Sequence, residues 1–201
     1  MNFKLLVALL LLFSFSGKAQ NTVSIAFQNS YTYEYNQEYD RAVQSMISVY
    51  SDKSYDINLR LGWLNYLKGD YTKSVSYYKM ATRLIPKSIE ARIGLVYPLQ
   101  VLQKWDDIIK VYEQILSIDP YHSKTNYQLA YIYYVRKDYR KSYNYAKRVF
   151  EVLPFDYDTN LLLGKLSISL GNISEAQKHL NKALNSSPSS AEVINILKSI
   201  N

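Results

Sequence analysis

The stretch YDINLRLGWLNYLKGDYTKSVSYYKMATRLIPKS, at residues 55–88, contains near its end a proline that recurs at a fixed interval along the chain. The prolines at this interval, each 34 residues after the last, are Pro86, Pro120, Pro154 and Pro188. The chain has one further proline, Pro98. A period of this size is typical of stacked copies of one supersecondary unit. Because proline has no backbone N–H and stops a helix, we expect each periodic proline just after the last helix of a unit.

Other positions recur in the same frame. They are the Leu-Gly pairs Leu61-Gly62 and Leu163-Gly164, the turns Gly69-Asp70-Tyr71 and Gly171-Asn172-Ile173, and the small residues Ser74, Ser142 and Ala176. Small residues let two antiparallel helices approach closely, and an Asp or Asn in the turn can cap the second helix. The frame therefore predicts four helical hairpins, at residues 55–88, 89–122, 123–156 and 157–190.

This pattern resembles that of the tetratricopeptide repeat (TPR) family, W-x2-L-G-x2-Y, then A-x3-F, then P. The resemblance covers residues 23–201, although the leading Trp of the family is replaced by Asn58, Arg92, Asn126 and Asn160. It implies an all-α fold, a right-handed α-solenoid of helix-turn-helix repeats, and a function as a non-catalytic protein–protein interaction module.

Both ends of the array depart from the repeat. Residues 20–54 are predicted to form a divergent N-terminal repeat, because the interval from Ala42 to the equivalent Ser74 is 32 residues and terminal repeats are commonly atypical. Residues 191–201 carry an apolar stripe and are predicted to form a C-terminal capping helix, with Ser189 in a capping box with Glu192.

The second unit carries the proline that stands outside the period. Pro98 lies inside its expected first helix, where it removes one hydrogen bond and its ring presses on the carbonyl of Gly94. We expect a kink in the helix at 89–102. The alternative is ordinary divergence of one repeat, without a bend that serves function.

The first 19 residues have the pattern of a secretory signal peptide. Lys4 precedes an unbroken apolar run, and Gly17-Lys18-Ala19 places small residues before a cut at Gln20. An uncleaved membrane anchor is the alternative, but the apolar run is shorter than the roughly 20 residues needed to span a bilayer. We therefore expect an exported protein, periplasmic or secreted, that does not span the membrane after cleavage.

Composition limits the remaining functions. The chain has a formal net charge of +7, but its basic residues are spread along it, which indicates solvated helix faces and no nucleic-acid partner. It has no cysteine and two histidines, His122 and His179, which we expect to be plain surface or boundary residues. No catalytic, phosphate-binding or metal-binding motif is present, so neither catalytic residues nor a cofactor nor a metal is predicted.

A candidate binding surface follows from the resemblance, because TPR proteins line their concave groove with the first helix of each unit. The aromatic residues at those positions are Trp63, Tyr66, Tyr97, Tyr127, Tyr131 and Tyr134. Such rings are common anchors for a bound peptide. The alternative, of equal weight, is that these rings pack under neighbouring helices. Three other rings, Tyr71, Trp105 and Tyr139, are expected to pack between helices. No basic pair aligns at the groove positions, which argues against a clamp for a carboxylate terminus.

Two functions remain open at this point. The first is an adaptor or scaffold that binds a peptide or partner protein in its concave groove. The second is a permanent structural subunit of a cell-envelope complex. An enzyme is disfavoured because no catalytic constellation is visible.

Overall fold

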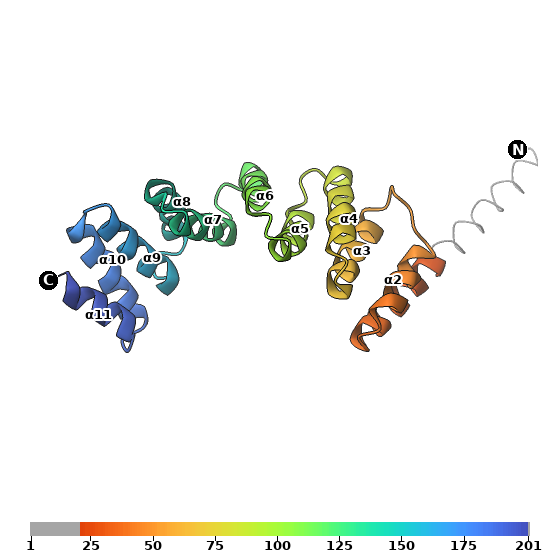
Figure 1. Ribbon diagram of the computed structural model, residues 1–201, viewed down its shortest axis with the longest axis horizontal. Helices are drawn as coiled ribbons and strands as arrows, with labels where there is room; N and C mark the ends of the chain where they lie inside the picture. Colours follow the sequence, from red (N-terminus) through yellow and green to blue (C-terminus); the bar gives the residue numbers. More distant parts are fainter. Residues whose placement is uncertain (1–20, 201) are drawn as a thin grey trace, which may run out of the picture. The chain divides into compact units, whose positions relative to one another are not determined.

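The computed structural model describes residues 21–200, and these form helices and turns without strands (Figure 1). The expected signal peptide at 1–19 lies outside this range. Residues 21–35 are helical. The helices that follow are α2 (Tyr39–Ile47), α3 (Tyr55–Lys68), α4 (Tyr71–Leu84), α5 (Ile89–Val101), α6 (Trp105–Ile118), α7 (Ser123–Val135), α8 (Tyr139–Val152), α9 (Tyr157–Ser169), α10 (Ile173–Ser186) and α11 (Ala191–Ser199). The predicted all-α solenoid of helical hairpins is confirmed.

The chain divides into two compact units, one up to Ile108 and one from Ile109 onward. The boundary falls inside α6. In the first unit α2 and α4 both contact α3, and in the second α8 contacts α7 and α9 while α10 contacts α9 and α11. Each unit therefore has its own core between successive hairpins.

The turn inside each hairpin needs a left-handed residue at one fixed position. Gly69 has φ +88° and Gly171 has φ +78°, and the positions between them in the 34-residue frame, Gln103 and Lys137, have φ of 55° and 61°. Glycine takes this conformation without steric cost, whereas Gln and Lys are held in it by the helices on either side.

Helix caps follow the sequence closely. The second helix of a hairpin is capped by Asp70, Asp138 or Asn172, whose side chains accept from Lys73 N, Lys141 N and Glu175 N. The capping helix differs from expectation by one residue, because Ser190 and not Ser189 accepts from Val193 N. Ser190 has the extended backbone of a cap, so the backbone geometry decides between two adjacent serines.

Within a hairpin the small positions bring the two helices together. Ser74 Oγ donates to the carbonyl of Gly62 at 2.7 Å, and Ser142 Oγ donates to that of Ala130 at 2.7 Å. In each pair the two residues are on the facing helices of one hairpin, α3 with α4 and α7 with α8. The small side chain thus both permits the approach and adds a hydrogen bond across it.

The asparagines that replace the family's leading Trp have a structural role that the sequence did not reveal. Asn160 Nδ2 donates to the carbonyl of Pro154 at 3.1 Å and to that of Asp156 at 2.8 Å. Asn126 Nδ2 makes the same pair of bonds to Pro120 at 2.9 Å and His122 at 3.2 Å. Each buried amide therefore ties the proline of one repeat to the first helix of the next.

Pro98, the proline outside the 34-residue period, leaves helix α5 unbroken. Helix α5 runs from Ile89 to Val101 with Pro98 in its last turn, and the Pro98 carbonyl still accepts from Leu102 N at 3.0 Å. Proline lacks the N–H that would donate a helical hydrogen bond, and here that loss occurs only three residues before α5 ends at Val101. The kink expected there stays a prediction.

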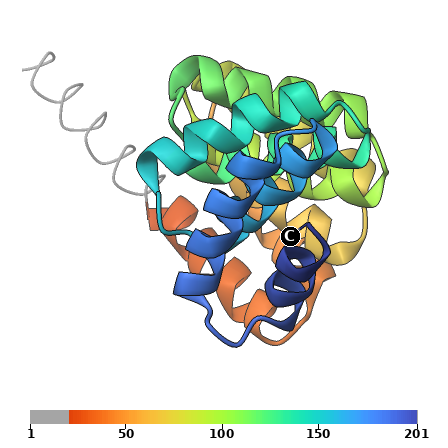
Figure 2. The same ribbon diagram turned by 90° about the vertical axis from the view of Figure 1, so that its left-hand side faces the viewer.

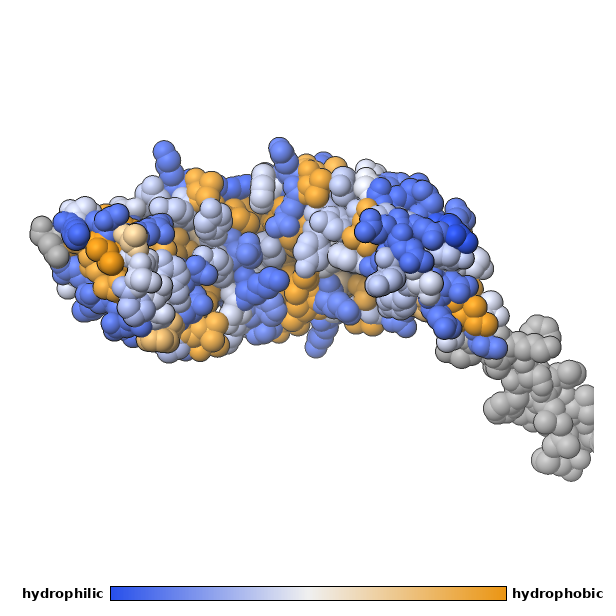
Figure 3. Space-filling view, turned by 90° about the horizontal axis from the view of Figure 1, so that it is seen from below, coloured by the Kyte–Doolittle hydropathy of each residue, from blue (hydrophilic) through white to orange (hydrophobic). Residues whose placement is uncertain are grey.

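Helix α11 covers the end of the last hairpin. Its buried Val193 belongs to the cluster that contains Ala176, Leu180 and Ala183 of α10. The partly buried side chains of Ile196, Leu197 and Ile200 pack against this cluster. Figure 2, which faces the C-terminal end, shows α11 beside α10. On the face seen in Figure 3, apolar residues form separate orange areas between polar ones. Among residues 21–200 no helix has the length and apolar character required to cross a membrane.

Candidate peptide-binding groove

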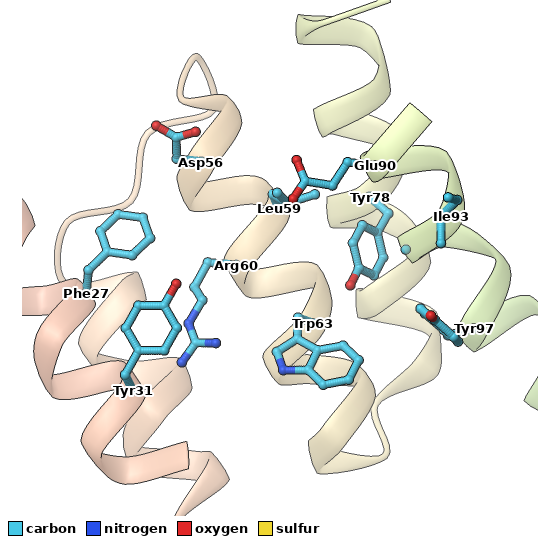
Figure 4. Close-up of a pocket in the computed structure, with 11 residues that line it drawn as sticks. Phe27, Tyr31, Asp56, Leu59, Arg60, Trp63, Tyr78, Glu90, Ile93 and Tyr97 are labelled. Carbon is cyan, nitrogen blue, oxygen red and sulfur yellow. The ribbon is translucent and has the colours of Figure 1, made fainter. Parts of the chain in front are cut away.

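Helices α3 and α5 of the first unit contact each other and present matching residues to one cavity of about 810 Å³ (Figure 4). Residues 34 positions apart form four pairs that line it: Asp56 with Glu90, Leu59 with Ile93, Arg60 with Gly94, and Trp63 with Tyr97. The cavity therefore has an acidic end, an aliphatic middle and an aromatic end. The repeat itself generates this order, because each pair occupies equivalent places on two successive first helices.

The Tyr78 ring of α4 lies between these two helices. A Cβ atom built on Gly62 would lie 2.9 Å from this ring, and one built on Gly94 would lie 2.2 Å from it. Both distances are shorter than van der Waals contact, so the two glycines make the space that the ring fills. Burial raises the pKa of the Tyr78 hydroxyl well above its ordinary value of 10. Tyr78 thus closes the cavity between α3 and α5 as a neutral side chain.

The helix at residues 21–35 forms the opposite wall. Its Phe27 and Tyr31 line the cavity, and three of its side chains hold Arg60. Glu34 forms an ion pair with the guanidinium, Ser30 Oγ accepts from Nε at 3.0 Å, and the Tyr31 ring centroid lies 3.8 Å from Cζ. The Arg60 side chain is only 7% exposed. Its charge is therefore neutralised by Glu34 before any ligand arrives.

Three of the predicted site residues meet at the aromatic end. Trp63 stacks on Tyr66 with centroids 5.6 Å apart and meets Tyr97 edge-on at 6.2 Å, while Tyr66 lies 5.7 Å from Tyr97. Trp63 Nε1 also donates to Glu34 Oε1 at 2.7 Å. Tyr97 keeps 37% of its surface exposed. The three rings are therefore already packed together, and Tyr97 remains partly accessible to a ligand.

The acidic end of the cavity is more exposed to solvent than the aromatic end. Asp56 and Glu90 lie in the first turns of α3 and α5 and are exposed. Tyr55 donates to Glu90 Oε2 at 3.0 Å, and its hydroxyl lies 2.7 Å from Ser88 Oγ, the N-cap of α5. Tyr157 and Ser190 repeat this contact at 2.8 Å in the second unit. A tyrosine hydroxyl therefore joins the start of each of these repeats to the start of the next.

The remaining predicted site residues belong to the second unit, and two of the three are partly buried. Tyr127 and Tyr134 pack against a core cluster that includes Ala130 and Leu163. Burial, with the nearby charge of Asp158, raises the pKa of Tyr127 to about 12. Tyr131 alone of the three is exposed, at 52%. Packing is thus the main role of two of these rings.

Two expectations about individual side chains were wrong. Trp105, expected between helices, is 45% exposed because it is the first residue of α6. His179, expected near the surface, is buried, with Nδ1 3.1 Å from Asn160 Oδ1 and its ring edge-on to Phe150 at 5.0 Å. His122 does lie at a repeat boundary, where it caps α7.

Sequence reasoning missed the wall at residues 21–35 and the arginine that it holds. Arg60 occupies the repeat position taken by Gly94 in the next unit, and this break in the pattern was a usable signal. Phe27, Tyr31 and Glu34 lie in a polar helix with no repeat match, so nothing in the pattern indicated which of its faces meets α3. Within residues 21–200, no group of three or more acidic or histidine side chains is arranged to hold a metal ion.

Comparison with known proteins identifies the repeat. The sequence model of the tetratricopeptide repeat matches residues 55–88 and 157–190. No curated protein matches the chain. Among solved structures, a MamA protein has a TM-score of 0.71 at 17% identity, covering 86% of this chain and 96% of that one. MamA from Desulfovibrio magneticus has a TM-score of 0.67 at 14% identity, covering 85% and 97%.

A tetratricopeptide repeat protein from Parabacteroides merdae has a TM-score of 0.72 at 16% identity, covering 86% of this chain and 70% of that one. At these identities the likeness concerns the fold. The repeat match at residues 55–88 and 157–190 coincides with the helix pairs α3–α4 and α9–α10 described above. The chain therefore contains tetratricopeptide repeats and has the fold of tetratricopeptide repeat proteins.

Proposed function

We propose that this chain is a non-catalytic protein-interaction module whose main binding site is the groove of the first unit. The observation that carries the proposal is the cavity of about 810 Å³ lined by paired residues of α3 and α5. Concave sites with rigid aromatic walls and a few polar groups are typical of binding surfaces. The tetratricopeptide fold supports the same function, since its stacked hairpins serve as platforms for peptides.

The groove is suited to binding because much of it is already ordered. Trp63 is fixed by its bond to Glu34, and Arg60 is held by three side chains of the neighbouring helix. A ligand therefore does not have to immobilise these long side chains, which lowers the entropic cost of association. Tyr97 is the open ring against which an apolar side chain of the ligand would pack.

The proposal includes export. The pattern of residues 1–19 supports a protein that is periplasmic or secreted and that acts as an adaptor or scaffold in the cell envelope. Its partner would be a protein or a peptide, and neither a nucleic acid nor a cofactor is part of the proposal.

Affinity capture from envelope extracts tests groove binding. The bait is the purified chain, compared with Tyr97→Ala, which opens the aromatic end, and with Tyr35→Ala as a matched control. Tyr35 is in the same unit, is highly exposed and does not line the cavity. We expect Tyr97→Ala to lose partners that the wild type and Tyr35→Ala both retain. Retention of every partner by Tyr97→Ala would contradict the proposal.

One observation favours the second candidate, a permanent structural subunit. The leading segment exposes large apolar or aromatic side chains that do not line the groove, among them Ile25, Ile47 and Tyr50. A permanent partner could cover such a surface. If Ile25→Ser with Ile47→Ser abolishes capture while Tyr97→Ala does not, the structural role is correct and groove binding is not.

A further inference from the structure

We propose that the groove of the first unit selects a basic peptide segment. In this proposal a lysine or arginine of the ligand meets Asp56 and Glu90, and an apolar or aromatic side chain of the same segment packs on Trp63 and Tyr97. The inference rests on the proposed function, because it names the chemistry of the ligand that the same groove would bind.

The charged residues that line the groove favour a basic ligand. The charged residues that line it are Asp56, Glu90 and Arg60. Arg60 is paired with Glu34, whereas neither Asp56 nor Glu90 makes an ion pair within the described part of the chain. The uncompensated charge of the groove is therefore negative, in a chain whose formal net charge is +7. Complementary charge is what steers and selects a partner.

The aromatic end agrees with a cationic ligand. Trp63 and Tyr97 line the same cavity, and Tyr31, which also lines it, already holds the guanidinium of Arg60 over its ring. Trp and Tyr faces attract ammonium and guanidinium groups. A basic segment would therefore meet carboxylates at one end of the groove. At the other end it would meet aromatic rings, which do not repel a positive charge.

The distance between the two ends sets the spacing in the ligand. Asp56 and Trp63 are seven residues apart on α3, which corresponds to about 10 Å at a rise of about 1.5 Å per residue. A peptide in the polyproline II conformation rises about 3.1 Å per residue and has three residues per turn, so three steps cover this distance and return to the same face of the peptide. The ligand pattern is a basic residue, two further residues and then an apolar or aromatic one.

The order of acid, aliphatic and aromatic residue occurs only in the first two repeats. The equivalent positions hold Lys124, Tyr127 and Tyr131 in the third repeat, and Asp158, Leu161 and Lys165 in the fourth. Lys165 is paired with Glu192. Neither set combines a carboxylate with an aromatic ring, so the selectivity is assigned to the groove of the first unit.

Fluorescence anisotropy with two peptides tests the inference. One labelled eight-residue peptide contains Lys-Ser-Leu-Phe, and the other has Glu in place of Lys. The protein variants are Asp56→Asn with Glu90→Gln, and Asp158→Asn with Glu151→Gln as a control that makes the same two chemical changes in the second unit. Circular dichroism establishes that each variant keeps the wild-type helix content and melting midpoint.

We expect the Lys peptide to bind the wild type and the control equally, and to bind the groove variant about fivefold more weakly, since exposed charge pairs contribute modestly. The Glu peptide should bind the wild type more weakly than the Lys peptide does. Rising salt should reduce this preference.

Arg60 Nη2 is buried and has no hydrogen-bond partner among residues 21–200, so it is the group that could bind an anion instead. The inference is overturned if the Glu peptide binds as tightly as the Lys peptide, as it would if Arg60 Nη2 bound it, or if neutralising Asp56 and Glu90 has no effect. It is also overturned if the Lys peptide does not bind at all. The proposed function fails separately, when Tyr97→Ala leaves the capture of envelope partners unchanged. The two failures are thus distinguishable, because one concerns the charge and the other the aromatic end.

Discussion

The ring of Tyr78 sets how closely α4 approaches α3 and α5. It fits because Gly62 and Gly94 have no Cβ, and the same arrangement recurs in the last repeat, where a Cβ on Gly164 would lie 2.6 Å from Leu180. A glycine on one helix therefore faces a large side chain on the next at two places in the chain. The glycine of the Leu-Gly pair is therefore needed because a side chain there would clash with the facing helix. It is not needed for an unusual backbone conformation.

We expect Gly94→Ala to destabilise the protein by about 1–3 kcal/mol, because the new methyl would lie 2.2 Å from the Tyr78 ring and a backbone or ring must shift. Urea unfolding followed by circular dichroism measures this change. In the background of Tyr78→Leu the same substitution should cost clearly less. An equal cost in both backgrounds would show that the ring is not the obstacle.

His179 makes stability depend on pH. Burial lowers its pKa below the ordinary 6.5, against the attraction of Glu175, while Lys178 and Lys182 add to the lowering. The unfolded chain therefore binds a proton more readily than the folded one below pH 6.5. The free energy of unfolding should fall as the pH drops from 6.5 toward the folded pKa. His179→Gln should flatten this part of the profile, and an unchanged slope would show that another group is responsible.

At the scale of elements, the buried asparagines join each proline-containing turn to the helix that follows. Asn160 makes two such bonds, and its Oδ1 also lies near His179 Nδ1. We expect Asn160→Ala to cost about 1–3 kcal/mol, because two partly buried carbonyls lose their donor and a fully buried amide is removed. Asn195→Ala, at an exposed position of α11, is the control and should have little effect on the urea midpoint. Equal effects would rule out the linking role.

The helices themselves were largely predictable, because proline, glycine and capping residues fix helix ends through local chemistry. The left-handed turns at Gln103 and Lys137 were not, since neither residue favours that conformation by itself. Their conformation is imposed by the two helices that they join. Ser190 was missed as the cap of α11 for a similar reason, since Ser189 offers the same hydroxyl one residue earlier.

At the scale of the whole molecule, the repeat frame predicted which first helices would share a surface, and it brought Trp63, Tyr66 and Tyr97 together in one unit. It could not predict that residues 21–35 would complete the groove. That helix lacks the repeat pattern, and its contacts to Arg60 and Trp63 are tertiary. The frame also could not distinguish the open Tyr131 from the packed Tyr127 and Tyr134, which share its helix.

The proposal of export leads to a prediction about the whole chain. If the full chain is expressed in a bacterium with an outer membrane, we expect the mature protein in the periplasmic or extracellular fraction, with Gln20 as its first residue. Amino-terminal sequencing of the purified protein measures this. Changing Ala19 to a bulky residue should block the cut, since processing requires a small residue there. Recovery of a chain that still begins at Met1 in the cytosol would contradict export.

The two tryptophans have different surroundings, and this gives the protein an optical readout of its own. Trp63 is half-buried, with its indole N–H on Glu34, whereas Trp105 is exposed at the start of α6. Trp105→Phe would leave a single indole, located in the groove. Its emission would shift to shorter wavelengths when a bound peptide displaces water from the ring. Occupancy of the groove could then be followed without attaching any label to the protein.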